Sequence, residues 1–458
     1  MRVFSLISLI ALTACTPAPQ ADVTMNRPDD ALQGTALPAM QSFASGVGAA
    51  PQRSNTAIAA DILDLTFRME SGRTVPVLSR FDGPVTVSLV GDVPPTARPD
   101  LARLIGRFRN EAGIDVRMGD PGKTAAITIE FQPRAVMQRV VPNAACFVVP
   151  RVSSWAEYRA KRNTPAVDWG TLVRRDRVAI FVPSDTSPQE VRDCLHEETA
   201  QAMGPLNDLY RLADSVFNDD NFNTVLTGFD MLVLRTIYAP DLRTGMNEAE
   251  VAVRLPALLS RLNPAGNVAG RAPDARVPPR SWTEAVQAAF SSRSGDAARR
   301  AAANRMLAIA RAQGWQDNRL AFSQFAVGRT AVANDPMLAE TAYLAAGRLY
   351  RSLPGGQVHA AHVDMQLAAF ALSTGRFDRA ITLADSAIPV VTRAENAALL
   401  ATLLLIKSEA LAATGHDGQA RAAYLDSLGW ARYGFGSDKQ VRARMSEIAA
   451  LAARGKRG

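Results

Sequence analysis

The sequence predicts an α+β domain followed by an all-α domain of helical repeats. Short strand-like apolar runs are mixed with helical patterns between residues 58 and 262. A stretch dense in Pro, Gly and Ala, residues 263–280, then interrupts both patterns. The remainder, residues 281–458, is Ala-rich, helical throughout and internally repetitive. We therefore expect a first domain at 58–262, a linker at 263–280 and a repeat domain at 281–458.

The beginning of the chain has the pattern of a bacterial secretion signal. Arg2 supplies a positive charge, and the apolar run that follows is shorter than the ~20 residues a membrane helix needs. Leu-Thr-Ala-Cys, ending at Cys15, resembles a lipobox, the motif at which the signal is removed and the cysteine is lipid-modified. The motif implies a signal peptide at 1–14 and a membrane anchor on Cys15. The alternative is an ordinary secretory signal with a chance cysteine.

The residue after this cysteine is Thr16, not Asp. By resemblance to the sorting rules of bacterial lipoproteins, this favours an outer-membrane lipoprotein that faces the periplasm. Residues 15–57 are rich in Pro, Ala, Gly, Ser and Asn and show no sustained period, so we expect a flexible tether.

The charge distribution and the cysteine content bear on the binding partner and on the cellular compartment. The 458-residue chain carries a formal net charge of +7, but this charge is spread widely without a Lys/Arg block. No basic helix or basic-aromatic motif is present, so nucleic acid is not an expected partner. Beyond Cys15 only Cys146 and Cys194 remain, and an oxidising compartment favours a disulfide between them. Two buried free thiols are the alternative.

The first domain is expected to follow the order β-α-β-β-β-β-α, with one helix leaving the last strand. The strands are expected at residues 84–90, 114–118, 126–131, 145–150 and 177–183, and the helices at 58–69, 97–112, 187–204, 229–238 and 247–262.

The helix at 187–204 has strong start and stop signals and the most suggestive residues of the chain. Ser187 is suited to cap it, Glu190 completes a capping box, and Gly204 ends it. It contains HEETAQAMG, which is close to the HExxH motif of zinc proteases. Aligned on His196, however, the second ligand falls on Ala200, which cannot bind metal.

A register one residue later fits better. When the zinc-protease motif HExxHxxGxxH is aligned so that its glycine falls on Gly204, its three ligand positions fall on Glu197, Gln201 and Asn207, and Asp208 follows the last of them. The catalytic Glu of the motif then falls on Glu198. In this register the segment resembles a metzincin-like metalloprotease in which every His is replaced, and His196 is a bystander.

The resemblance continues downstream of this helix. Phe217 takes the place of the methionine in the metzincin turn, and Asp230 and Tyr238 mark a closing helix. Together, the α-helical motif at 187–204 and these downstream segments closely resemble a bacterial family classed as domain of unknown function 2927, over roughly residues 60–262. That family implies the zincin-like fold but brings no established activity.

The residue types argue against ordinary zinc hydrolysis. Gln and Asn amides are weak zinc ligands, and an oxygen-rich set suits calcium or magnesium better. We expect no cofactor; the alternative is a divalent metal held by Glu197, Gln201, Asn207 and Asp208. Glu198 is either a general base or a buried carboxylate with a structural role. His359 and His362 share a helix face but lack further ligands nearby.

Two segments of the C-terminal half repeat. AAFALSTGRFDRAITLADSAI and IKSEALAATGHDGQARAAYLDSL align Gly375 with Gly415 and Ala380 with Ala420, an offset of 40 residues. The A-x-x-x-G-x-x-x-x-A core resembles tetratricopeptide repeats, in which Gly forms the turn and Ala allows close helix packing. An irregular helical bundle is the alternative.

Two functions follow as expectations. The first is an interaction or scaffold protein of the envelope, lipid-anchored, with a non-catalytic metzincin-like domain and a protein or peptide partner on the repeats. The second is an envelope metallopeptidase-like hydrolase with Glu198 as general base and an unusual oxygen-rich metal site. Whether the protein is an enzyme stays open at this level.

Overall fold

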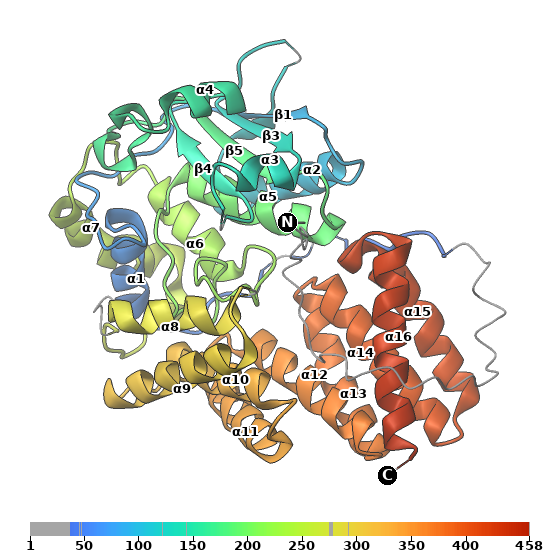
Figure 1. The fold of residues 1–458 in the computed structure, drawn as a ribbon. Helices are drawn as coiled ribbons and strands as arrows, with labels where there is room; N and C mark the ends of the chain where they lie inside the picture. Colours follow the sequence, from blue (N-terminus) through green and yellow to red (C-terminus); the bar gives the residue numbers. More distant parts are fainter. Residues whose placement is uncertain are drawn as a thin grey trace, which may run out of the picture.

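The computed structural model describes residues 37–457, except 45, 47, 121, 143, 274–277 and 292. The expected signal peptide and Cys15 lie outside these residues. The described chain forms an α/β region around a five-stranded sheet and then an all-helical region, which occupies the lower left and the right of Figure 1. None of the described helices is long and apolar enough to cross a membrane.

The sheet has the strand order β2-β1-β3-β5-β4, in which β4 is antiparallel to β5 and the other pairs are parallel. All five strands lie within a few residues of their expected places: β1 Val85–Gly91, β2 Val116–Met118, β3 Ile127–Gln132, β4 Phe147–Pro150 and β5 Val178–Pro183. Residues of β5 alternate between two cores because successive side chains of a strand point to opposite faces. Val178, Ile180 and Val182 join the main core, whereas Ala179 and Phe181 pack with Met137 and Trp155 on the other face.

The helices of the α/β region pack around this sheet (Figure 1). Their bounds are α1 Asn55–Phe67, α2 Ala97–Arg107, α3 Arg134–Gln138, α4 Trp155–Lys161, α5 Pro188–Met203, α6 Gly228–Ile237 and α7 Glu248–Leu262. A π-helical turn, Phe108–Ala112, continues α2, so the expected helix 97–112 is divided in two. The main core lies between one face of the sheet and helices α1, α2, α5, α6 and α7.

Nine helices of the described residues follow: α8 Arg280–Phe290, α9 Asp296–Ala312, α10 Asn318–Ala331, α11 Pro336–Ser352, α12 Gln357–Ser373, α13 Phe377–Arg393, α14 Ala397–Ala413, α15 Asp417–Phe435 and α16 Asp438–Gly455. The pairs α12–α13 and α14–α15 are helical hairpins that begin 40 residues apart, at Gln357 and Ala397. Gly375 and Gly415 take positive φ at their turns, where an L side chain would be strained. The α16 helix packs against both α12 and α14.

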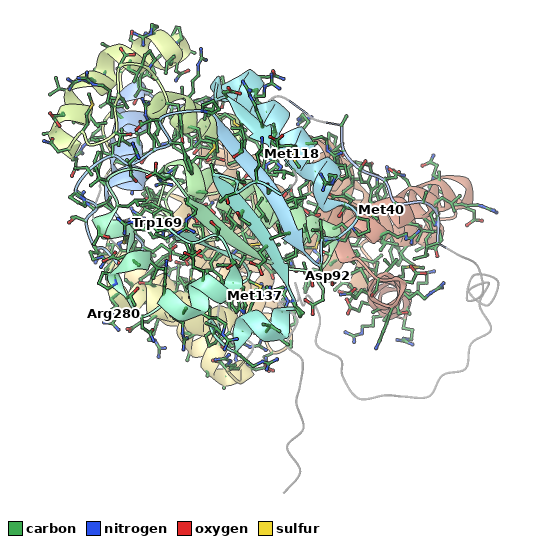
Figure 2. The ribbon with its side chains drawn as sticks, turned by 90° about the horizontal axis from the view of Figure 1, so that it is seen from above. Met40, Asp92, Met118, Met137, Trp169 and Arg280 are labelled. Carbon is green, nitrogen blue, oxygen red and sulfur yellow. A yellow bond between two sulfur atoms is a disulfide. The ribbon has the colours of Figure 1, made fainter. Side chains whose placement is uncertain are left out.

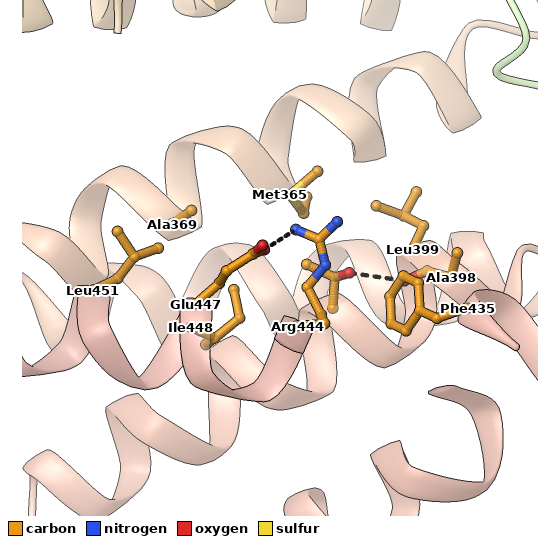
Figure 3. A pocket seen from close by; sticks show the side chains of 10 residues that line it. Met365, Ala369, Ala398, Leu399, Phe435, Arg444, Glu447, Ile448 and Leu451 are labelled. Atoms are coloured by element: carbon orange, nitrogen blue, oxygen red, sulfur yellow. Dashed lines mark hydrogen bonds and ion pairs between the residues drawn. The ribbon is translucent and has the colours of Figure 1, made fainter. Parts of the chain in front are cut away.

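The α16 helix covers the face that α12 and α14 share, and the seam is nearly filled. A cavity of about 20 Å³, room for one water, lies between Met365, Leu399 and Ile448 (Figure 3). Arg444 pairs with Glu447 at 2.9 Å across its rim. The inner face of these two hairpins is therefore occupied by the chain itself.

The two regions are joined by side chains, although residues 263–280 separate them in sequence. Tyr210 and Phe222 of the α/β region are buried in the core of the first helices of the all-helical region, where Tyr210 meets Trp282 at 5.0 Å between ring centroids. His359 Nε2 lies 2.8 Å from Asp220 Oδ2, and both side chains are fully buried. His359 therefore serves the contact between regions.

The expected tether ends earlier than its sequence suggests. Residues from 37 onward, where described, lie against the body, and Met40 sits beside the C-terminal helices in Figure 2. Phe43 is buried and stacks on Trp430 at 4.3 Å between ring centroids. The backbone N–H of Gln41 donates to the carbonyl of Gly429 at 3.1 Å. Aromatic, backbone and side-chain contacts together hold these residues, which composition assigned to a flexible tether.

Candidate functional site

The helix α5 forms as its sequence predicts. Ser187 Oγ accepts from the N–H of Glu190 at 3.2 Å, and Gly204 ends the helix by donating to the carbonyl of Ala200 at 3.2 Å. A Cβ on Gly204 would lie 2.7 Å from Ile237 Cδ1, so α6 can approach only a glycine here. The disulfide Cys146–Cys194 is confirmed and ties α5 to the segment that leads into β4.

A buried arginine, Arg175, holds the C-terminal end of α5. Its guanidinium donates to the carbonyls of Gln201 at 2.5 Å and Gly204 at 2.7 Å, and its face lies 4.8 Å from the Trp169 ring. A cation is favoured at a helix C-terminus because the unpaired carbonyls carry partial negative charge. Burial lowers the pKa of Arg175 to about 10, so it stays charged at neutral pH.

The predicted site residues do not all converge. Gln201 Nε2 donates to Asp208 Oδ2 at 3.3 Å, so these two meet. Asn207 is buried, and its amide donates to the carbonyl of Asp64 at 3.1 Å. Glu197 is half-buried on the same side as Gln201, whereas Glu198 is only 6% exposed.

The carboxyl groups of this site repel one another. Burial, followed by the charges of Asp219 and Glu70, raises the pKa of Glu197 to about 8. Burial and the charges of Glu197 and Glu70 raise the pKa of Glu198 well above its usual range. Burial and the charges of Glu197, Glu70 and Asp219 do the same to the pKa of Asp208. Burial and mutual repulsion therefore favour the protonated form of all three groups, and a neighbouring cation would favour the charged form.

Two further carboxylates act on this site: Glu70, which the sequence did not single out, and Asp219, whose polar stretch 219–223 the sequence did not connect to α5. Glu70 follows α1, and Asp219 lies in the polar loop before α6 with φ +56°. Both are exposed and sit far from α5 in sequence, so no spacing rule connects them to it. The phenol of Tyr210 donates to Asp219 Oδ2 at 2.5 Å and ties this loop to the segment that follows α5.

His196 is a structural residue. It is 5% exposed, and its Nδ1 accepts from the N–H of Leu226 at 3.2 Å. Burial first, and then the positive charge of Arg192, lowers its pKa well below the usual range, so the ring is neutral. The most conspicuous residue of HEETAQAMG thus satisfies a backbone group away from the carboxylates.

The downstream residues singled out in the sequence are also structural. Asp230 accepts from Ser215 Oγ at 2.5 Å and from the N–H of Thr227 at 2.7 Å, which fixes the turn before α6. Phe217 is fully buried in the main core. The phenol of Tyr238 donates to the carbonyl of Met203 at 3.0 Å and secures the end of α6 to the end of α5.

The opposite face of α5 docks the C-terminal helices. Arg192 Nη1 lies 3.0 Å from Glu395 Oε2, and Gln189 Nε2 donates to Asn396 Oδ1 at 3.1 Å. Gln189 Oε1 accepts from the N–H of Ala398 at 2.8 Å, next to the start of α14. One helix therefore carries the carboxylates on one side and the contact between regions on the other.

Within the part of the chain that the structure describes, no three His, Cys, Asp or Glu side chains form a group that could hold a metal ion. The arrangement is a set of mutually repelling carboxyl groups without an imidazole. Chemically it offers oxygen acceptors, a buried acid at Glu198, and no electrophilic centre of its own.

These features define a class of protein: an α/β domain with a carboxylate-rich site, joined through one helix to an all-helical region. Residues 55–257 match the family described as "Protein of unknown function (DUF2927)". Neither the curated proteins nor the solved structures gave a match to this chain.

Proposed function

We propose that this protein is a lipid-anchored envelope protein that acts by binding another protein, and that its metzincin-like domain does not hydrolyse a substrate. The outer-membrane location and the lipid on Cys15 rest on the lipobox-like sequence. The tetratricopeptide-like character of the helical region rests on the 40-residue offset of its hairpins and on buried Ala380 and Ala420. Helical repeats of this kind commonly bind proteins.

One observation carries the non-catalytic half of the proposal. The positions that would hold zinc are Glu197, Gln201 and Asn207, one carboxylate and two weakly binding amides, and Asn207 Nδ2 donates to the carbonyl of Asp64. A catalytic zinc site needs three good ligands and an open position for water. One carboxylate and two amides, without an imidazole, do not meet that need.

The surface available to a partner is restricted because α16 covers α12 and α14. The α11 helix instead exposes large apolar side chains: Met337 is 82% exposed and Leu344 36%. We therefore place partner contact on the outer face of α11. A pull-down of the tagged full chain from envelope extracts should lose its captured protein when Met337→Glu and Leu344→Glu are combined.

The matched control is Val253→Glu on α7, an apolar residue that is 81% exposed in the α/β region. This variant should capture the same protein as the unaltered chain. Equal capture by the α11 variant, or equal loss in the control, contradicts this placement of the partner.

A second function is favoured by Glu198 alone. Its Oε2 is buried and accepts no hydrogen bond from the described residues. A carboxyl with a raised pKa in such a place is a feature of general acids and bases. If a hydrolase is present, Glu197, Gln201, Asn207 and Asp208 would be nearest to its metal, and Glu198→Gln should abolish peptide hydrolysis by the purified chain.

A further inference from the structure

Residues 37–44, which we call the docked segment, lie on the C-terminal helices as an extended chain without helix or strand of its own. Leu37 packs at one end against apolar side chains of α14, α15 and α16. Phe43 is buried near the other end and is 7% exposed. Met40, which lies beside the C-terminal helices in Figure 2, is 40% exposed. The segment therefore contacts the body through two apolar side chains six residues apart.

The ring of Phe43 occupies an aromatic pocket to which both regions contribute. It stacks on Trp430 of α15 at 4.3 Å between ring centroids, and the guanidinium of Arg192 in α5 lies 5.4 Å from its centroid. Arg192 lies at the same distance from the ring of Tyr433. Among the described residues, all other buried members of this core come from α12–α16, which pack on one another directly. The walls of the pocket are therefore built without the docked segment.

The main chain of the docked segment is held as well. The N–H of Gln41 donates to the carbonyl of Gly429 at 3.1 Å, and the guanidinium of Arg432 donates to the carbonyl of Pro38 at 2.8 Å. A Cβ on Gly429 would lie 2.6 Å from Gln41 Cγ, so α15 lacks a side chain where the segment crosses it. Main-chain hydrogen bonds for affinity and side-chain pockets for specificity are the two components of peptide recognition.

The docked segment is joined to the α/β region through small residues. The backbone N–H groups of Gly46 and Gly48 donate to Glu395 Oε1 at 3.3 Å and to Glu111 Oε2 at 3.2 Å. The first helix, α1, begins only at Asn55. Glycine gives the backbone wide conformational freedom. The segment therefore leaves α15 without the loss of any helix or strand.

We propose that this face of α15, with Arg192 beside it, is a peptide-recognition site and that the docked segment occupies it as an exchangeable internal ligand. The partner that fits the site presents an extended segment with an apolar side chain and, six residues later, an aromatic one. This goes beyond the proposed function because it assigns a second surface, separate from α11. A ligand on the same chain has an effective concentration of about 1 mM, so a partner has to compete with it.

The test uses the fluorescently labelled full chain in detergent and the peptide Leu-Pro-Ala-Met-Gln-Ser-Phe-Ala, which copies the docked segment. Binding is measured by thermophoresis with peptide concentrations up to about 5 mM. The variant Phe43→Ser, which empties the aromatic pocket, should bind the peptide at least about tenfold more tightly than the unaltered chain. The unaltered chain should still bind it weakly, because its own segment exchanges.

Matched changes define the specificity of the site. The variant Met40→Ser loses an exposed side chain of the same segment and should bind the peptide as the unaltered chain does. A peptide with Ser in place of Phe should bind neither the unaltered chain nor Phe43→Ser. The double variant Phe43→Ser/Gly429→Ala should also lose binding while its circular dichroism spectrum stays unchanged, because the added methyl group fills the space of the Gln side chain.

No binding to the unaltered chain at about 5 mM peptide would show that the docked segment is a fixed part of the fold and would overturn the inference. Equal binding to the unaltered chain and Phe43→Ser would overturn it too, as would binding that survives loss of the Phe from the peptide. The comparison of the two peptides on the unaltered chain does not depend on the folding of any variant.

Dimerisation of the unaltered chain that Phe43→Ser abolishes would assign the site to a second copy and overturn a foreign partner. Each of these failures leaves partner capture through α11 standing, because α11 is not part of this site. Loss of that capture would in turn leave the peptide result unchanged.

Discussion

The buried arginine between α5 and the C-terminal helices offers the sharpest stability prediction. Arg192 is 2% exposed, pairs with Glu395 at 3.0 Å, and lies 5.4 Å from the ring centroids of both Phe43 and Tyr433. Replacing one partner of a buried ion pair leaves the other charge uncompensated and costs about 3–5 kcal/mol. Glu395 keeps a side-chain exposure of 15%, so we expect Arg192→Met to cost about 3 kcal/mol.

The matched control is an arginine of α3 whose partner, Glu190, lies on the same helix as Arg192. Arg134 pairs with Glu190, and the side chains are 22% and 37% exposed, so Arg134→Met should cost less than about 1 kcal/mol. Urea unfolding followed by tryptophan fluorescence measures both variants. A double-mutant cycle with Glu395→Gln should show a coupling energy above about 1 kcal/mol. Equal destabilisation by the two arginine substitutions would refute the reasoning.

Three further predictions concern stability. Arg175→Met leaves two carbonyls of α5 without a donor and should cost about 3 kcal/mol in urea unfolding, whereas exposed Arg174→Met should cost less than about 1 kcal/mol. Reduction of Cys146–Cys194, which spans 48 residues, should lower the free energy of unfolding by about 4 kcal/mol, and an unchanged melting temperature in reductant would contradict this. Burial lowers the pKa of His362 from 6.5 to about 3, so the unfolded chain alone binds this proton and stability is lost as pH falls below 6.5. Between pH 7 and pH 5 the free energy of unfolding of the unaltered chain should fall by about 2 kcal/mol more than that of His362→Phe. An equal fall in both proteins would contradict the lowered pKa of His362.

The sequence was most informative where a local signal decided the outcome. The apolar runs predicted five strands because buried strands need continuous or alternating apolar residues. The cap at Ser187 and the stop at Gly204 predicted the ends of α5, and two cysteines predicted the disulfide. In each case the deciding residues are neighbours in sequence or are few enough to pair by elimination.

The sequence was least informative where distant segments meet. Glu70 and Asp219 join the site only because the end of α1 and the loop before α6 fold toward α5. Arg175 and Arg192 look like surface residues by type, yet carbonyls and a carboxylate allow both to be buried. Phe43 gave no periodic signal, because one aromatic residue has no period.

Our central proposal is that the domain at residues 55–257 does not act as a zinc hydrolase, although the sequence of α5 resembles a zinc-protease motif. The most direct measurement is the metal content of the purified full chain after growth in zinc-supplemented medium and buffer exchange, determined by mass spectrometry. The account predicts less than about one tenth of an equivalent of zinc, because the positions that would bind it hold no imidazole. One equivalent of zinc, lost on Glu197→Gln together with Gln201→Ala, would contradict it.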